Sequence, residues 1–130
     1  MAEKLSRKQF HFRPSERGLC AWDIDRLIEL TQDLPVEQVC LTAIREVETN
    51  YWFAHHSEPT VRVIVEHMRM ANEADLSYPI IIDGDGRIMD GMHRVVKALL
   101  EGRPTVAARR LSSIPDPDYV GVHPDDLPTE

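Results

Sequence analysis

Apolar residues recur at helical spacing in three stretches of this 130-residue chain. The first stretch follows Asp23, a residue type that caps helix N-termini, and places Ile24, Leu27 and Ile28 on one face. This spacing predicts a short helix, which must end before Pro35 because proline disfavours helical backbone in the residue before it.

The second stretch begins at Pro59, which suits the first turn of a helix. Its apolar stripe consists of Val61, Ile64, Val65 and Met68. Helical spacing of this kind is typical of a surface helix that buries one side. We therefore expect the stripe to pack in the core.

The third stretch belongs to the most regular part of the sequence. Pro79–Asp83 is a short apolar run rich in β-branched residues and predicts a strand. Gly84–Gly86 then predicts a tight turn, and Arg87–Met89 a returning strand. A helix should follow from Asp90-Gly91, with its stripe at Met92, Val95, Val96 and Leu99.

Two further strands are expected around this region. Gly102 and Pro104 end the last helix, and Thr105–Leu111 predicts a final strand. Earlier in the chain, Glu37–Arg45 alternates in a way that places Val39, Leu41 and Ala43 on one face. The expected fold class is therefore α+β, a single compact domain with a small mixed sheet and packed helices.

Charge divides the chain into three parts. Residues 1–18 have a net charge of +3 with breakers at Pro14 and Gly18, and predict a basic extended arm. Residues 112–130 have a net charge of −5 and are rich in proline, and predict an acidic tail or a loosely packed wrap. Residues 19–111 are expected to form the domain.

Composition excludes several classes of protein. No stretch reaches the roughly 20 apolar residues that a membrane helix needs, and the polar N-terminus is not a secretory signal, so we expect a cytoplasmic protein. Residues 1–111 together have a net charge of −2 and lack the basic surplus of an autonomous duplex-DNA-binding protein. Cys20 and Cys40 do not form a disulfide framework, and we expect buried, reduced thiols.

The start of the third helix has the chemistry of a phosphate site. First-turn N–H groups stabilise an anion, and Gly91 permits close approach of the backbone. Arg94 offers a planar donor fork, and His93 offers a hydrogen bond or proton transfer. Cations here are mildly unfavourable unless an anion offsets them. The alternatives stay open: Gly91 as a simple turn, Asp90 as an ordinary N-cap and Arg94 in solvent.

Residues 79–111 resemble the ParB/sulfiredoxin superfamily. The resemblance rests on Pro-Ile-Ile-Ile-Asp, Gly-Asp-Gly and Arg-Ile-Met-Asp-Gly-Met-His-Arg in order and spacing, followed by a helix ending in glycine. With the preceding helix and strand it covers roughly residues 36–111. It implies an α+β fold that binds nucleotide phosphates at a Gly-x-x-Arg corner, as ParB proteins bind CTP.

Two departures narrow this resemblance. Met92 stands where sulfiredoxins carry their nucleophilic cysteine, and a thioether cannot replace it, so sulfiredoxin repair is disfavoured. Nineteen residues after Leu111 cannot hold the DNA-binding and dimerisation regions of ParB. Asp90 is shared with the free-serine kinases of the superfamily, so phosphotransfer remains open.

The resemblance implies a set of site residues. Those expected to bind the nucleotide are Asp83, Gly91, Met92, His93 and Arg94. Those expected to be catalytic are Glu46, Glu48, Asp90 and His93. Asp90 would hold Mg²⁺, and the cofactor would be a nucleoside triphosphate or diphosphate. Either glutamate could instead be a solvated loop charge. Trp52 or Tyr51 could stack on a base or fill the core.

We therefore expect a nucleotide-binding protein of the ParB-like fold, an NTPase or a small-molecule phosphotransferase. Its further partner would be a small-molecule acceptor or a protein. A non-catalytic protein- or nucleic-acid-interaction module of the same fold is the main alternative, and a ParB-like nuclease is a third. An enzyme should place a carboxylate beside Arg94, whereas a module should expose an apolar patch elsewhere.

Overall fold

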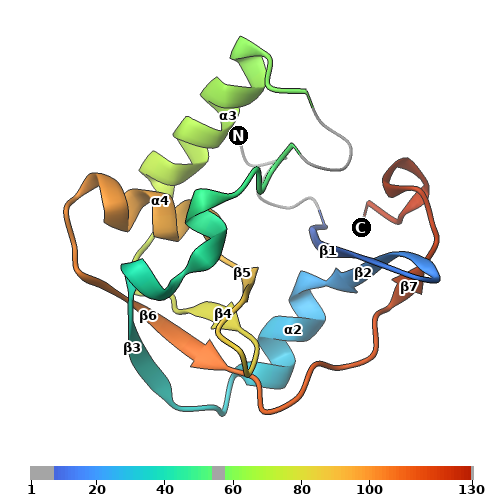
Figure 1. Cartoon of the computed structure of the whole chain (residues 1–130), viewed down its shortest axis with the longest axis horizontal. Helices are drawn as coiled ribbons and strands as arrows, with labels where there is room; N and C mark the ends of the chain where they lie inside the picture. Colours follow the sequence, from blue (N-terminus) through green and yellow to red (C-terminus); the bar gives the residue numbers. More distant parts are fainter. Residues whose placement is uncertain (1–7, 54–57, 130) are drawn as a thin grey trace. The chain divides into compact units, whose positions relative to one another are not determined.

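The computed structural model describes residues 8–53 and 58–129, and these divide into two compact units. Unit 1 combines the two ends of the chain, residues 1–33 and 114–130, and unit 2 is the continuous segment 34–113. Both contain helix and strand, so the α+β class is confirmed (Figure 1). No helix among the described residues is long and apolar enough to cross a membrane.

Unit 1 is built on a three-stranded antiparallel sheet with the order β1-β2-β7. Its elements are β1 (Phe10–Ser15), β2 (Gly18–Asp23), α2 (Ile24–Thr31), β7 (Tyr119–Val120) and the 3-10 helix η3 (Pro124–Asp126). The helix α2 is the one predicted, and the Asp23 side chain caps it by accepting the N–H of Asp25. Ile24 and Leu27 are buried, whereas Ile28 is exposed.

Residues 1–7 of the predicted basic arm lie outside the described ranges. The described part of the arm contains a paired strand instead. Residues 10–15 pair with residues 18–23, so the boundary expected after residue 18 falls inside a hairpin. Pro14 had indicated a break, but β1 is an edge strand and proline is tolerated there. Gly18 enters β2 with φ of +112°, a left-handed conformation that closes the turn.

The acidic segment 112–130 contributes to unit 1 from Ile114 onward. Val120 pairs with Cys20 in β7, and the Trp22 indole N–H donates to the Pro115 carbonyl over 2.8 Å. One of its acidic side chains, Asp118, accepts the Asp23 N–H and forms an ion pair with Arg26. The Asp118 carboxylate, which looks like a tail charge in the sequence, therefore takes part in folding contacts.

Unit 2 contains the mixed sheet that the sequence predicted, with the order β3-β6-β4-β5. The strands are β3 (Val36–Cys40), β4 (Ile80–Ile82), β5 (Ile88–Asp90) and β6 (Thr105–Arg110). β4 runs parallel to β6, and the other two pairs are antiparallel. The helices are α3 (Val61–Glu73) and α4 (Met92–Leu100), with the 3-10 helices η1 (Leu41–Ala43) and η2 (Arg45–Glu48).

The strand predicted over residues 37–45 is shorter than expected. It ends at Cys40, and the chain turns directly into η1 and η2. Val39 and Leu41 are buried as the alternation predicted, but Ala43 is exposed. The cysteines are free, as expected, although only Cys20 is buried and Cys40 is exposed.

The core of unit 2 lies between one face of the sheet and α4. Its buried members are Val39, Leu41, Ile44, Ile80, Ile82, Ile88, Met92, Val95, Ala98, Val106 and Ala108. The stripe predicted for α4 is thus largely correct, although Leu99 is 43% exposed and Ala98 takes the buried position. Three-residue strands suffice here because isoleucines on β4 and β5 are almost completely buried.

The core packing predicted for the apolar stripe of α3 is wrong. Val61 is 78% exposed and Met68 60% exposed, and Ile64 and Val65 are also exposed. Within α3 the buried residue is Ala71, which borders the same stripe seven residues after Ile64. Helical spacing correctly indicated the helix, but it does not show whether other residues cover the apolar side.

Two polar ties hold α3 against α4. His67 on α3 hydrogen-bonds His93 on α4. Lys97 on α4 donates to the carbonyls of Asn72 and Ala74 at the other end of α3, over 3.1 and 2.7 Å. A lysine at these last carbonyls complements the negative end of the helix dipole. The middle and the C-terminal end of α3 are therefore each hydrogen-bonded to α4.

Candidate functional site

The turn between β4 and β5 is closed by the side chain of Asp83. Its Oδ1 accepts the backbone N–H groups of Asp85 and Arg87, each over 2.9 Å, and Asp83 is only 2% exposed. The Asp83 N–H also donates to the Arg87 carbonyl. The sequence predicts that Asp83 binds the nucleotide, whereas in the structure this carboxylate oxygen lies inside the turn, where it fixes the path of β5.

The step from β5 into α4 requires a glycine at position 91. Gly91 is the N-cap of α4 and has φ of +110°. A Cβ atom there would lie 2.6 Å from the Ile80 side chain and 3.2 Å from its Cα. The helix therefore starts directly against β4. Asp90, considered as an N-cap from the sequence, lies one residue earlier at the end of β5.

Arg94 ties this corner together through its guanidinium group. One terminal nitrogen donates to the Pro79 and Tyr78 carbonyls over 2.6 and 3.2 Å, and the other donates to the Asp90 carboxylate over 3.1 Å. Burial raises the pKa of Asp90, and the neighbouring Arg94 opposes that rise. The anion expected beside the cationic first turn is therefore supplied, in this structure, by Asp90.

His93 forms part of a stack of three aromatic rings. Its Nε2 lies 2.8 Å from Nδ1 of His67 in a hydrogen bond between α4 and α3. The Trp52 indole stacks on both imidazoles, with ring centroids 4.0 Å from His67 and 4.8 Å from His93. Phe53 contacts His67 edge-on. Trp52, expected either on a base or in the core, thus covers the histidine pair.

The His93 imidazole is neutral at pH 7. Burial is the main cause that lowers its pKa to about 4, and the nearby His67 and Arg94 lower it further. A neutral imidazole can accept or donate a hydrogen bond, or ligate a metal ion. The chemistry open to His93 is therefore that of a neutral ring.

The two candidate glutamates of η2 have different surroundings. Glu46 is buried, and its Oε2 accepts the Ile88 N–H over 3.0 Å and lies 3.7 Å from Arg87 Nε. Its Oε1 is buried without a hydrogen-bond partner among the described residues. Glu48 is exposed. Only Glu46 is therefore connected to β5, the strand that leads into Gly91.

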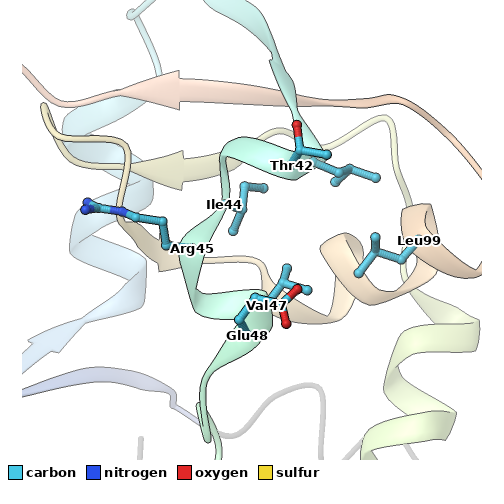
Figure 2. Close-up of a pocket in the computed structure, with 7 residues that line it drawn as sticks. Thr42, Ile44, Arg45, Val47, Glu48 and Leu99 are labelled. Atoms are coloured by element: carbon cyan, nitrogen blue, oxygen red, sulfur yellow. The ribbon is translucent and has the colours of Figure 1, made fainter.

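Glu48 instead lines an open pocket of about 380 Å³ on another part of unit 2 (Figure 2). The pocket is lined by Leu41, Thr42, Ile44, Arg45, Val47, Glu48 and Leu99. Figure 2 shows Arg45 and Leu99 on opposite sides of it. None of Gly91, His93 and Arg94 contributes to its wall. The concave surface and the predicted phosphate corner are thus separate features.

His67 is the functional candidate that the sequence analysis missed. It lies 26 residues from His93, and neither residue belongs to a short metal-binding motif. Its position on α3 is away from the apolar stripe, and the stripe was assigned to the core. The usable signal was that a helix preceding this corner carries a histidine in its middle, but only the packing of α3 on α4 brings the rings together.

Comparisons do not assign the chain to a family: no family model, curated protein or solved structure matches it. Within residues 8–53 and 58–129, no group of three or more histidine, cysteine, aspartate or glutamate side chains is arranged to hold a metal ion. Asp90, the predicted Mg²⁺ ligand, is paired with Arg94.

Proposed function

We propose that the corner between β5 and α4 binds the phosphates of a nucleotide and supports phosphoryl transfer or nucleotide hydrolysis. The observation that carries the proposal is the buried Glu46 carboxylate of η2, whose Oε1 has no hydrogen-bond partner among the described residues. Its other oxygen accepts the Ile88 N–H of β5, the strand that enters the corner. An unpaired buried carboxylate oxygen costs about 1–3 kcal/mol or more, so it is rare without a water, an ion or a catalytic purpose.

The start of α4 supplies the anion-binding half of this proposal. By their place in the first turn, the N–H groups of Met92 and His93 have no acceptor within the helix, whereas those of Arg94 and Val95 donate to the Gly91 carbonyl. Gly91 allows a ligand to approach the backbone closely. No side chain caps these groups. Phosphate oxygens would accept from the N–H groups of Met92 and His93.

Glu46 supplies the acid–base half. It is hydrogen-bonded to Ile88, three residues before Gly91, which corresponds to about 10 Å along an extended strand. That span suits a group that acts on the far end of a bound oligophosphate. Glu46 would take the proton of the attacking water or hydroxyl, or hold Mg²⁺.

Arg94 and Asp90 would exchange partners when phosphate binds. One terminal nitrogen of Arg94 would leave Asp90 for a phosphate oxygen, while the other keeps its contacts with Tyr78 and Pro79. Asp90 would then be available to Mg²⁺, the role that the sequence suggested. After this exchange Arg94 would be paired with the phosphate and Asp90 with Mg²⁺, so neither charge would be left without a partner.

Calorimetry with ATP, ADP, CTP and GTP in the presence of Mg²⁺ tests the binding step. We expect one nucleotide to bind. Asp90→Asn should weaken the Mg²⁺ dependence, and Arg94→Gln should weaken binding itself. The double variant D90N/R94Q leaves neither charge unpaired and controls for damage to the fold. Absence of binding at millimolar nucleotide, or full affinity in the double variant, would refute the proposal.

Turnover is tested by a matched pair of substitutions on η2. Glu46→Gln should retain nucleotide binding and lower the turnover rate by about 10²–10⁴-fold, the usual contribution of a general base. Glu48→Gln, two residues away and exposed, should leave the rate unchanged. Equal effects of the two changes would remove Glu46 from the mechanism.

The exposed side of α3 favours a second candidate, an interaction module. Its apolar stripe is flanked by Arg62, Glu66, Arg69 and Glu73, which follow one another along the helix at spacings of four, three and four. In an antiparallel pair of α3 helices from two copies, Arg62 would oppose Glu73 and Glu66 would oppose Arg69. This charge complementarity points to a second copy of the chain as the occupant.

Sedimentation at several protein concentrations tests this second candidate. The wild type should dimerise, Arg62→Glu should weaken the dimer, and the charge-exchanged R62E/E73R should restore it. A monomer at all concentrations, or failure of the double variant to recover, would contradict it.

A further inference from the structure

We infer that Nδ1 of His67 and Nε2 of His93 bind one divalent transition-metal ion of the zinc class between α3 and α4. The two nitrogens already face each other at 2.8 Å. This site is separate from the Mg²⁺ of the nucleotide proposal, and it does not depend on that proposal.

The geometry of the pair is close to that of two metal ligands. Zn–N bonds of about 2.0–2.1 Å at a tetrahedral angle place two ligand nitrogens about 3.3 Å apart. The two nitrogens would therefore move apart by about half an ångström, and the rings would turn so that both lone pairs point at the ion instead of at each other. The ties from Lys97 to Asn72 and Ala74 hold the other end of the helix pair during that change.

Proton balance also permits a metal ion to replace the hydrogen bond between the two imidazoles. In the present hydrogen bond, one of the two facing nitrogens carries the proton. On metal binding that proton moves to the other nitrogen of the same ring, so both facing nitrogens present lone pairs and neither ring gains or loses a proton. Metal ligation requires a neutral imidazole with a free lone pair on the facing nitrogen.

The surroundings define which ion would bind. Imidazole nitrogens favour zinc, copper and nickel, whereas Mg²⁺ and Ca²⁺ require oxygen ligands. Trp52 covers both rings and Phe53 contacts His67, so one side of the site is apolar. The pair supplies two ligands, and water or an oxygen of a bound molecule would fill the other positions of a four-coordinate ion.

Trp52 provides a direct reporter, because its indole stacks on both proposed ligands. Addition of Ni²⁺, which is paramagnetic, to the full chain without an affinity tag should quench tryptophan fluorescence to saturation at one equivalent. Zn²⁺ should compete with Ni²⁺, and Mg²⁺ should not. Trp52→Phe should abolish the saturable quenching while calorimetry still detects the metal ion. Quenching that does not saturate, or that persists in W52F, would overturn the inference.

Two conservative substitutions keep the test independent of folding. His67→Asn and His93→Gln retain polar groups at the facing positions, and far-UV circular dichroism verifies the fold of each. Each change should lower Zn²⁺ affinity by at least about tenfold, the effect of losing groups that hold a metal ion. The matched control His123→Asn, at an exposed histidine in unit 1, should bind as the wild type does. Wild-type affinity in H67N and H93Q would exclude this site.

Discussion

The helices α3 and α4 are neighbours in unit 2 and look alike in the sequence, yet they use their apolar residues in opposite ways. α4 buries Met92, Val95 and Ala98 in the core. α3 exposes Val61 and Met68, and its His67 hydrogen-bonds His93 of α4. Periodicity therefore identifies a helix and its apolar side, but burial depends on what the rest of the chain can place there.

The largest expected effect concerns the start of α4. Gly91→Ala combines a left-handed backbone with a contact of 2.6 Å to Ile80, and should destabilise unit 2 by about 4 kcal/mol. The matched control is Gly102→Ala at the other end of the helix. Gly102 also has a positive φ, but nothing lies within 4 Å of the added Cβ. We expect about 1 kcal/mol there.

Urea denaturation of both glycine variants would measure this difference. If G91A and G102A cost the same, α4 does not begin in tight contact with β4, and the contrast with α3 loses its structural basis.

The second comparison replaces one valine by alanine in each helix, which removes two methyl groups in both cases. Val95→Ala, at a fully buried site on α4, should cost about 2–3 kcal/mol of unfolding free energy. Val65→Ala, on the exposed side of α3, should change it by less than about 0.5 kcal/mol in the monomer. Thermal and chemical unfolding at low protein concentration would decide between them. A large loss in V65A would show that the α3 stripe is covered.

The third effect tests the histidine contact between the helices. The pKa of His93 is about 4 in the folded protein and near 6.5 when unfolded, so the folded state binds fewer protons between these values. His93 therefore contributes fully to the stability of the folded state above pH 6.5, and this contribution is lost as the pH falls towards 4. With a chelator present, wild type should lose about 2 kcal/mol over that range beyond the loss in His93→Gln. Parallel pH profiles would contradict this expectation.

Much of unit 2 could be predicted from local signals. Backbone preferences of a few residues determine the strand before Asp83, the glycine-rich turn after it and the end of α4 at Gly102–Pro104. The α2 cap at Asp23 is of the same kind. Strand β1 was not predicted, because its basic charge and its proline indicate an extended arm. In the structure, pairing with β2 outweighs these local signals.

The candidate site could be predicted only in part. Gly91 and its role at the helix start follow from the sequence, because few other residues fit such a corner. The partners of Arg94 do not, since two of them are backbone carbonyls that have no sequence signature. The contact between His67 and His93 depends on how two helices pack. The burial of Glu46 Oε1, which has no hydrogen-bond partner among the described residues, depends on how η2 packs against β5.

The division of the chain has a consequence for its synthesis on the ribosome. Unit 2 is one uninterrupted segment, so all of it is available once residue 113 has left the exit tunnel. Unit 1 cannot complete its sheet until β7 emerges, because Val120 pairs with Cys20 across almost the whole chain. The β1–β2 hairpin must wait for its third strand while unit 2 folds. A strand made about a hundred residues later thus completes the sheet that the β1–β2 hairpin begins.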